Sequence, residues 1–121
     1  MDERRRFIRF ETSLGLKYAV PQADSDDSIA TSRDISREGL CISTNRLFSE
    51  GTVLEMRLDV PGDNMPVLAQ CKVAWARESY SGSNNFNIGL KFVQMTGLDK
   101  SRLLEYVYSQ WLRAKGFMQE A

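Results

Sequence analysis

Alternation of apolar and polar residues is the feature that most constrains how this chain can fold. The alternation is clearest from Leu54 to Val60, where Glu55, Arg57 and Asp59 separate apolar residues. Successive side chains of a β-strand point to opposite faces, so this pattern predicts a strand with one buried face. Five further segments are also predicted to be strands, at about residues 14–20, 29–35, 40–43, 67–75 and 87–93.

The pattern changes near the C-terminus, where apolar residues recur at helical spacing. These residues are Leu103, Leu104, Val107, Tyr108, Trp111 and Leu112. They predict an amphipathic helix from about Asp99, as the N-cap, to Ala114, with Gly116 just past its end. Six short strands separated by turns predict a mainly β fold: a small six-stranded antiparallel β-barrel with a C-terminal α-helix over one opening or flank.

The whole chain, residues 1–121, is predicted to be one domain. Its length is sufficient for a hydrophobic core without a disulfide or a structural metal. No internal repeat or linker marks a second domain. We expect a flexible basic arm over residues 1–11, the barrel over 12–95 and the helix over 98–116.

Composition disfavours several classes of function. The chain has 16 Lys and Arg against 16 Asp and Glu, and a general nucleic-acid binder usually has a basic surface. Histidine is absent, and we find no nucleophile motif or paired carboxylates, so the chain is not expected to be an enzyme or to need a cofactor or metal. Cys41 and Cys71 are predicted to be buried reduced thiols, which favours a cytoplasmic location. No apolar run reaches the ~20 residues of a membrane-spanning helix.

Positive charge is concentrated at the N-terminus, where Arg4, Arg5, Arg6 and Arg9 lie within nine residues. In an extended segment Arg5 and Arg9 lie on the same side. Each guanidinium has a rigid fork of donors that suits a phosphate or the O6/N7 edge of guanine, and a flat face that can stack on a base. Arg4 and Arg6 would add auxiliary charge. The alternative is a basic N-terminus with no specific role.

A second polar motif, Asp34-Ile35-Ser36-Arg37-Glu38-Gly39, lies between two predicted strands. The Asp34 carboxylate suits the N–H donors of guanine, Ser36 offers a hydroxyl, and Gly39 permits a positive φ or a close backbone approach. The alternative is that Asp34 and Ser36 only form hydrogen bonds within the turn. Arg37 and Glu38 are interpreted as exposed turn residues without a role.

Together, the two motifs resemble those of the PilZ domain family, an RxxxR motif (Arg5 to Arg9) and a [D/N]xSxxG motif (Asp34 to Gly39). The resemblance extends along nearly all of the chain. It implies a six-stranded barrel that binds the bacterial second messenger cyclic di-GMP. By position, Arg5 and Arg9 would hold phosphates and stack on guanine, and Asp34, Ser36 and Gly39 would meet guanine edges. Ile8 stands where the family often has proline.

The resemblance also implies a non-catalytic receptor that signals to a protein effector in motility or biofilm regulation. The arm would order on binding and so create or hide a surface that the effector recognises. The alternative is a ligand-independent PilZ-like interaction module in motility or surface-appendage assembly. A single-strand nucleic-acid binder is a third hypothesis, which neutral charge disfavours. We expect no DNA or RNA partner and no membrane insertion, and either a monomer or a homodimer.

Three other groups of residues are interpreted as structural. Trp75 and Trp111 are predicted to pack in the core. Tyr106 and Tyr108 are expected to help the helix cover the barrel, although a dimer or partner surface is the alternative. A cluster of aspartates, Asp24, Asp26 and Asp27, lacks the pattern of a calcium loop and is predicted to be a solvated loop.

Overall fold

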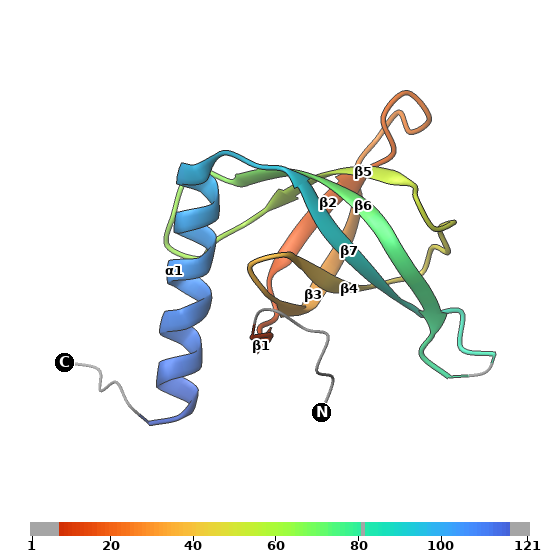
Figure 1. Ribbon diagram of the computed structural model, residues 1–121. Helices are drawn as coiled ribbons and strands as arrows, with labels where there is room; N and C mark the ends of the chain where they lie inside the picture. The colour runs from red at the N-terminus through yellow and green to blue at the C-terminus, as the bar shows by residue number, and fades with distance from the viewer. Residues whose placement is uncertain (1–7, 81, 117–121) are drawn as a thin grey trace.

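Seven strands and one helix form the described part of the chain (Figure 1). The computed structural model describes residues 8–80 and 82–116. The elements are β1 (Phe10–Glu11), β2 (Gly15–Ala19), β3 (Ser28–Ile35), β4 (Gly39–Thr44), β5 (Val53–Leu58), β6 (Val67–Glu78), β7 (Phe86–Gln94) and α1 (Gly97–Ala114).

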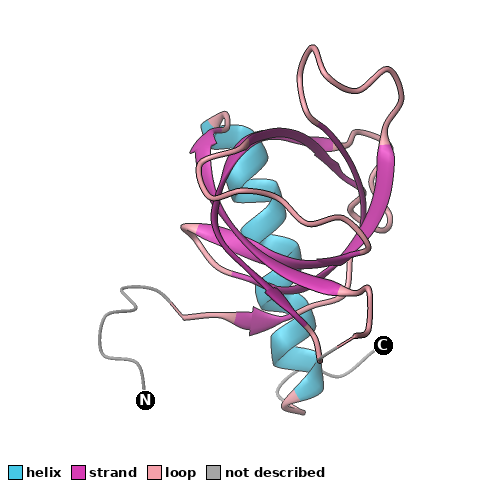
Figure 2. Cartoon of the chain, turned by 90° about the vertical axis from the view of Figure 1, so that its right-hand side faces the viewer, coloured by secondary structure: helices cyan, strands magenta, loops and turns pink. Residues whose placement is uncertain are grey.

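Six of the strands form a closed antiparallel barrel. The order is β3-β2-β5-β6-β7-β4, and pairing of β4 with β3 closes the ring. Figure 2 shows this ring with α1 behind it. The predicted six-stranded barrel with a C-terminal helix is therefore confirmed, and β1 is an additional strand outside the ring.

Strand β1 lies end to end with β2 along the same edge of β3. Phe10 pairs with Ile35, whereas Gly15 pairs with Thr31. The hydroxyl of Ser32 bridges the break between the two strands. It accepts a hydrogen bond from the Leu14 amide at 2.8 Å and donates one to the Thr12 carbonyl. The last two residues of the segment expected to be an arm thus form a strand, while residues 1–7 lie outside the described part.

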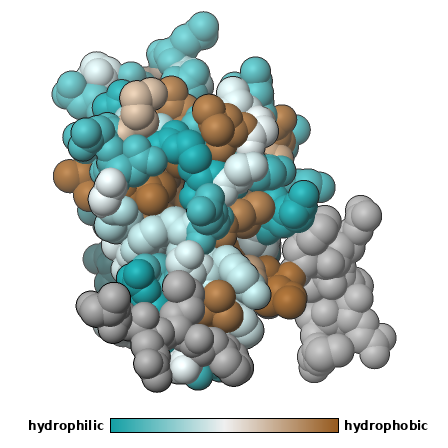
Figure 3. Space-filling model, turned by 90° about the vertical axis from the view of Figure 1, so that its left-hand side faces the viewer, coloured by the Kyte–Doolittle hydropathy of each residue, from teal (hydrophilic) through white to brown (hydrophobic). Residues whose placement is uncertain are grey.

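The core consists of the inward-facing residues of the barrel and two residues of the helix. As predicted, Leu54, Met56 and Leu58 of β5 are buried, and Leu103 and Val107 of α1 belong to the same cluster. The helix therefore covers one flank of the barrel, as expected. Figure 3 looks onto this flank, where hydrophobic residues are separated by hydrophilic ones and do not join in one patch.

The prediction that Trp75 packs in the core is wrong. The β6–β7 register shifts between Val73 and Trp75, so that Val73 pairs with Leu90 but Trp75 pairs with Gly89. Ala74 is the extra residue on β6. Because side chains alternate along a strand, one extra residue moves the next side chain to the other face. Trp75 is consequently on the outer face and only partly buried.

Trp111 is also outside the core cluster, although it is partly buried. Its ring packs edge-on against Phe10 of β1, with 5.7 Å between the ring centres, and it stacks with Tyr108 at 5.9 Å. Tyr106 packs against the core, whereas Tyr108 is 51% exposed. The aromatic residues of α1 thus contact β1, which directly follows Arg9.

Thr96, and not Asp99, caps the N-terminus of α1. Its hydroxyl accepts a hydrogen bond from the Asp99 amide at 3.1 Å, so the helix begins at Gly97. The Asp99 carboxylate instead accepts from the Leu68 amide at 3.3 Å and pairs with Arg102 at 2.8 Å. Arg102 also pairs with Asp63 at 2.7 Å, so the β5–β6 connection is joined to the helix.

Both cysteines are buried free thiols, as predicted. Burial raises the pKa of Cys71 to about 12. Within the described residues, no helix is long and apolar enough to cross a membrane, and no cluster of three or more metal-binding side chains occurs.

We expect Ser32→Ala to destabilise the protein by about 2 kcal/mol, because it leaves a buried amide and a buried carbonyl without their partner. Urea unfolding would measure this change. The matched control is Ser101→Ala on the exposed face of α1, which should alter the free energy of unfolding by less than about 0.5 kcal/mol. Equal stability of the two variants would contradict the bridging role of Ser32.

Candidate functional site

One ion pair joins the two sequence motifs. Arg9 precedes β1, and β1 pairs with the segment of β3 that includes Asp34. This pairing places Arg9 Nη1 2.6 Å from Asp34 Oδ1, with the side chains 26% and 28% exposed. The structure thus brings together the second arginine of the first motif and the aspartate of the second. Arg4, Arg5 and Arg6 lie outside the described residues.

A bulge in β3 turns Asp34 toward the outer face. Ser32 pairs with Ile42, but Asp34 pairs with Cys41, so that Arg33 is the extra residue. Ser32 is buried on the inner side, and without the bulge Asp34 would point there too. The bulge therefore moves the carboxylate out of the core to the position where Arg9 reaches it.

A row of four residues crosses the outer wall of the barrel from Asp34. Asp34 pairs with Cys41 on β4, Cys41 with Gly89 on β7, and Gly89 with Trp75 on β6. Adjacent strands lie about 4.8 Å apart, so the row extends about 14 Å. The indole lies close over Gly89, where an added Cβ would be 2.2 Å from the ring. The row forms a shallow floor with a carboxylate at one end and an aromatic ring at the other.

Ser36 forms hydrogen bonds within the turn that connects β3 to β4. Its hydroxyl accepts from the Glu38 amide at 3.2 Å, and its own amide donates to the Gly39 carbonyl at 2.8 Å. The side chain is only 2% exposed. These contacts are those of a serine that shapes a turn, and direct contact with a ligand stays a prediction for Ser36.

Gly39 is required by a close backbone approach. Its φ is not positive, unlike that of four other described glycines. An added Cβ would lie 1.9 Å from the Leu90 carbonyl oxygen of the neighbouring strand. Of the two expected reasons for a glycine at this position, a positive φ or a close backbone approach, the structure shows the close approach. Contact of Gly39 with a ligand stays a prediction.

A hollow of about 150 Å³ adjoins this floor. Its lining combines Arg9 and Gly39 with residues that the motifs did not indicate: Glu38, Ala74, Trp75, Gly89, Leu90 and Lys91. Arg9 and Lys91 are the cations of this lining, and Glu38 is its carboxylate. Outer-face positions of a barrel strand can be inferred from alternation, so Gly89 and Lys91 could have been found because they alternate with the inward residues Ile88, Leu90 and Phe92.

Further side chains modify the electrostatics of the floor. The Arg77 guanidinium carbon lies 5.0 Å from the centre of the Trp75 ring, within the range of a cation–π interaction. Burial, and then the charge of Asp34, raise the pKa of the Cys41 thiol, so it is protonated at neutral pH. The Glu38 carboxylate adds negative charge beside the cations that line the hollow. The protonated Cys41 thiol adds no charge.

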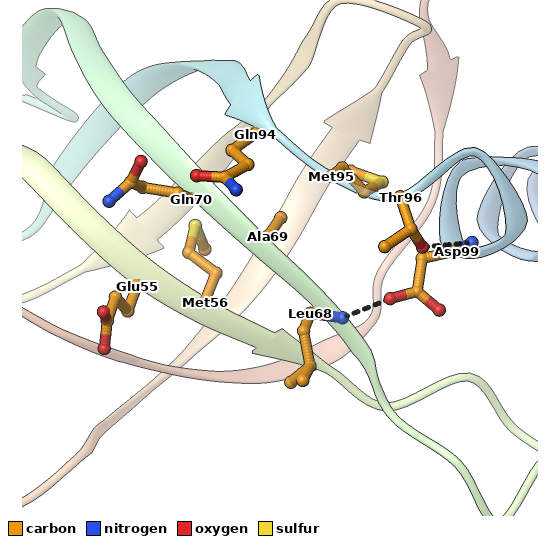
Figure 4. A pocket seen from close by; sticks show the side chains of 9 residues that line it. All are labelled: Glu55, Met56, Leu68, Ala69, Gln70, Gln94, Met95, Thr96 and Asp99. Atoms are coloured by element: carbon orange, nitrogen blue, oxygen red, sulfur yellow. Dashed lines mark hydrogen bonds between the residues drawn. The ribbon is translucent and has the colours of Figure 1, made fainter.

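A wider hollow of about 460 Å³ lies elsewhere, where β7 separates from β6 (Figure 4). Its lining includes Met56, Met95 and Leu68 together with the carboxylates Glu55 and Asp99, and it contains no lysine or arginine. Since Asp99 is already bonded to Leu68 and Arg102, this hollow does not suit an anionic ligand as the floor beside Arg9 does.

Comparisons with known proteins agree with the fold. The family model of the PilZ domain matches residues 3–109. Among solved structures, the PilZ domain of YcgR from Escherichia coli with c-di-GMP has a TM-score of 0.71 at 16% identity, covering 94% of this chain and 96% of that one.

Two longer proteins are also similar. The inhibitor of motility MotI/DgrA from Bacillus subtilis has a TM-score of 0.74 at 17% identity, covering 92% of this chain and 53% of that one. The K. pneumonia MrkH–c-di-GMP complex has a TM-score of 0.73 at 17% identity, covering 96% and 56%. This chain thus spans about half the length of those two proteins. The comparison with curated proteins by sequence finds no match.

The two glycines of the site should differ in their tolerance of alanine. Gly39→Ala places a Cβ against backbone, which cannot rotate away, so we expect it to destabilise the protein by about 2–3 kcal/mol or to prevent folding. Gly89→Ala meets the Trp75 side chain, which can move, and should cost about 1–2 kcal/mol and change indole fluorescence in a Trp111→Phe background. Thermal denaturation compares the two, and greater harm from Gly89→Ala would contradict the structure.

Proposed function

This chain belongs to the PilZ domain family, and on this basis we propose that it is a non-catalytic bacterial receptor for cyclic di-GMP. The observation that carries the proposal is the ion pair between Arg9 and Asp34, because it joins the two motifs at one place on the barrel wall. The solved PilZ domain of YcgR with c-di-GMP and the MrkH–c-di-GMP complex support the choice of ligand.

The Arg9–Asp34 pair leaves hydrogen-bonding capacity for a ligand. A guanidinium has five N–H donors, and Asp34 is bonded to one nitrogen, Nη1. The remaining donors suit a phosphate or the O6/N7 edge of guanine. Asp34 has a second oxygen that can accept from the N1–H and N2–H groups of guanine. The pair thus positions a donor group and an acceptor group for the same ligand.

The floor between Asp34 and Trp75 suits a flat base. Cys41 has a small side chain, and the Trp75 indole fills the space over Gly89, so a planar ring can approach the wall near Cys41 and stack against the indole. Trp75 borders this area and offers an aromatic edge or face, and stacking of a base on an aromatic ring contributes about 1–3 kcal/mol. A purine could therefore lie between the carboxylate and the indole.

The arm would complete the site. Arg5 is proposed to act with Arg9 on phosphate and guanine, with Arg4 and Arg6 as auxiliary charges. Ser36 and Gly39 would act mainly by shaping the turn that holds Asp34 and Glu38 next to the hollow. The loss of conformational entropy when the arm becomes ordered on binding would be offset by the charge-assisted contacts of its arginines with the ligand.

Phe10 provides a path from the ligand to the helix. It follows Arg9 directly and contacts Tyr108 and Trp111, with 6.3 and 5.7 Å between ring centres. A change in the arm would therefore alter the packing of α1, whose exposed Tyr108 side chain an effector could recognise. We propose a cytoplasmic protein effector in motility or biofilm regulation as the recipient of this signal.

Calorimetric titration with cyclic di-GMP tests the proposal. We expect saturable binding by the unaltered chain and at least about a tenfold loss of affinity in Arg9→Ala and in Asp34→Ala, because each removes a charge-assisted contact. The control Arg57→Ala alters an exposed arginine on β5, away from the floor, and should bind as the unaltered chain does.

Absence of heat and of a thermal shift with millimolar cyclic di-GMP would contradict the proposal. In that case, capture of a protein partner that survives the Arg9→Ala change would identify a ligand-independent interaction module instead.

A further inference from the structure

Two lysines lie directly opposite each other on the outer wall of the barrel. Lys72 of β6 pairs with Lys91 of β7, and both side chains are exposed. Neither makes a hydrogen bond or an ion pair with any residue that the structure describes. Like charges at directly opposed positions destabilise a sheet, so this pair has an unfavourable interaction, and neither lysine forms an ion pair with another described residue.

The lysine pair borders the proposed ligand site. Lys91 lines the hollow together with Arg9 and Trp75, and its partner on the other side is Gly39 of β4. Glu38 contributes a carboxylate to the same lining, but it forms no ion pair with Lys91. One ammonium group, that of Lys91, is therefore available to a ligand in the hollow, and Lys72 lies beside it on β6.

This local charge is not a consequence of general basicity, because the chain has equal numbers of basic and acidic residues. A second like-charge pair does occur, between Lys17 of β2 and Arg57 of β5. That pair does not line the hollow, which shows that the barrel tolerates such a pair without a ligand-binding role. Position beside the hollow, and not repulsion alone, distinguishes Lys72 and Lys91.

We propose that Lys72 and Lys91 form an anion subsite that binds one phosphate of the cyclic dinucleotide, while Arg9 binds the other. This inference rests on the proposed function. Arg9 adjoins β1, and three strand spacings of about 4.8 Å, or about 14 Å, separate the β1 and β7 backbones. The long side chains on each side can approach a ligand whose two phosphates lie at opposite edges of its ring.

The two ends of the site would recognise phosphate differently. Arg9 is held in place by Asp34 and presents a planar fork of donors, which favours one orientation of the phosphate. The lysines are unpaired and flexible, and an ammonium acts as a compact point charge. Lys91, which lines the hollow, would contact the phosphate, and Lys72 would add a second charge beside it.

Charge removal without loss of side-chain length tests the subsite. Calorimetric titration with cyclic di-GMP would compare the unaltered chain with the Lys72→Met/Lys91→Met double variant, which should bind about five- to thirtyfold more weakly. The Lys72→Arg/Lys91→Arg variant retains both charges and should bind within about threefold of the unaltered chain. The matched control, Lys17→Met/Arg57→Met, removes the other like-charge pair and should leave affinity unchanged.

Two additional measurements separate a binding role from a folding role. Without ligand, the Lys72→Met/Lys91→Met variant should be at least as stable to heat as the unaltered chain, because it loses a repulsion. Phosphorus NMR should show two signals for the bound ligand, whose phosphates are equivalent when free, and the double variant should shift mainly one of them.

The outcomes distinguish this inference from the proposed function. If the unaltered chain does not bind cyclic di-GMP, the proposed function and this subsite are both overturned. If it binds and the methionine double variant binds equally well, only the subsite is overturned, as it would be if these lysines served a protein partner. An equal loss of affinity in the arginine variant would also overturn it, because charge would then not be the cause.

Discussion

The register between β3, β4, β7 and β6 is the constraint on which the candidate site depends. This wall closes the barrel, and its pairing aligns Asp34, Cys41, Gly89 and Trp75 in one row. One-residue bulges at Arg33 and Ala74 turn both ends of the row outward. A bulge costs a regular hydrogen-bonded pair, but here the hydrophobic core is retained because Ile35 and Ala76 take the inward positions beyond each bulge.

Close backbone approach is the second requirement of this wall. At Gly39 and Gly89 an added Cβ would collide with the Leu90 carbonyl oxygen and the Trp75 ring. Gly39 thus allows β4 and β7 to pack closely, and Gly89 allows the Trp75 indole to lie against β7. The position of the aromatic ring that borders the site therefore depends on Gly89.

Charge on the wall is arranged asymmetrically. Arg9 is paired with Asp34, whereas Lys72 and Lys91 have no partner among the described residues. A paired guanidinium is oriented before binding, and unpaired ammonium groups supply attraction without fixed orientation. Strand β1 then links this surface to α1 through the contact of Phe10 with Trp111, so the ligand site and the helix share one short strand.

Local pattern in the sequence was sufficient to determine the six barrel strands, the helix, the inward faces such as Leu54, Met56 and Leu58, and the motif that includes Asp34. Burial of one face imposes alternation on a strand, and alternation is visible residue by residue. Tertiary structure alone decided that Trp75 faces outward, that Thr96 caps the helix, and that Gly89 and Lys91 line one hollow with Arg9, with Lys72 paired to Lys91. Bulges and strand register cause these arrangements, and both depend on how distant strands pair, which no single segment encodes.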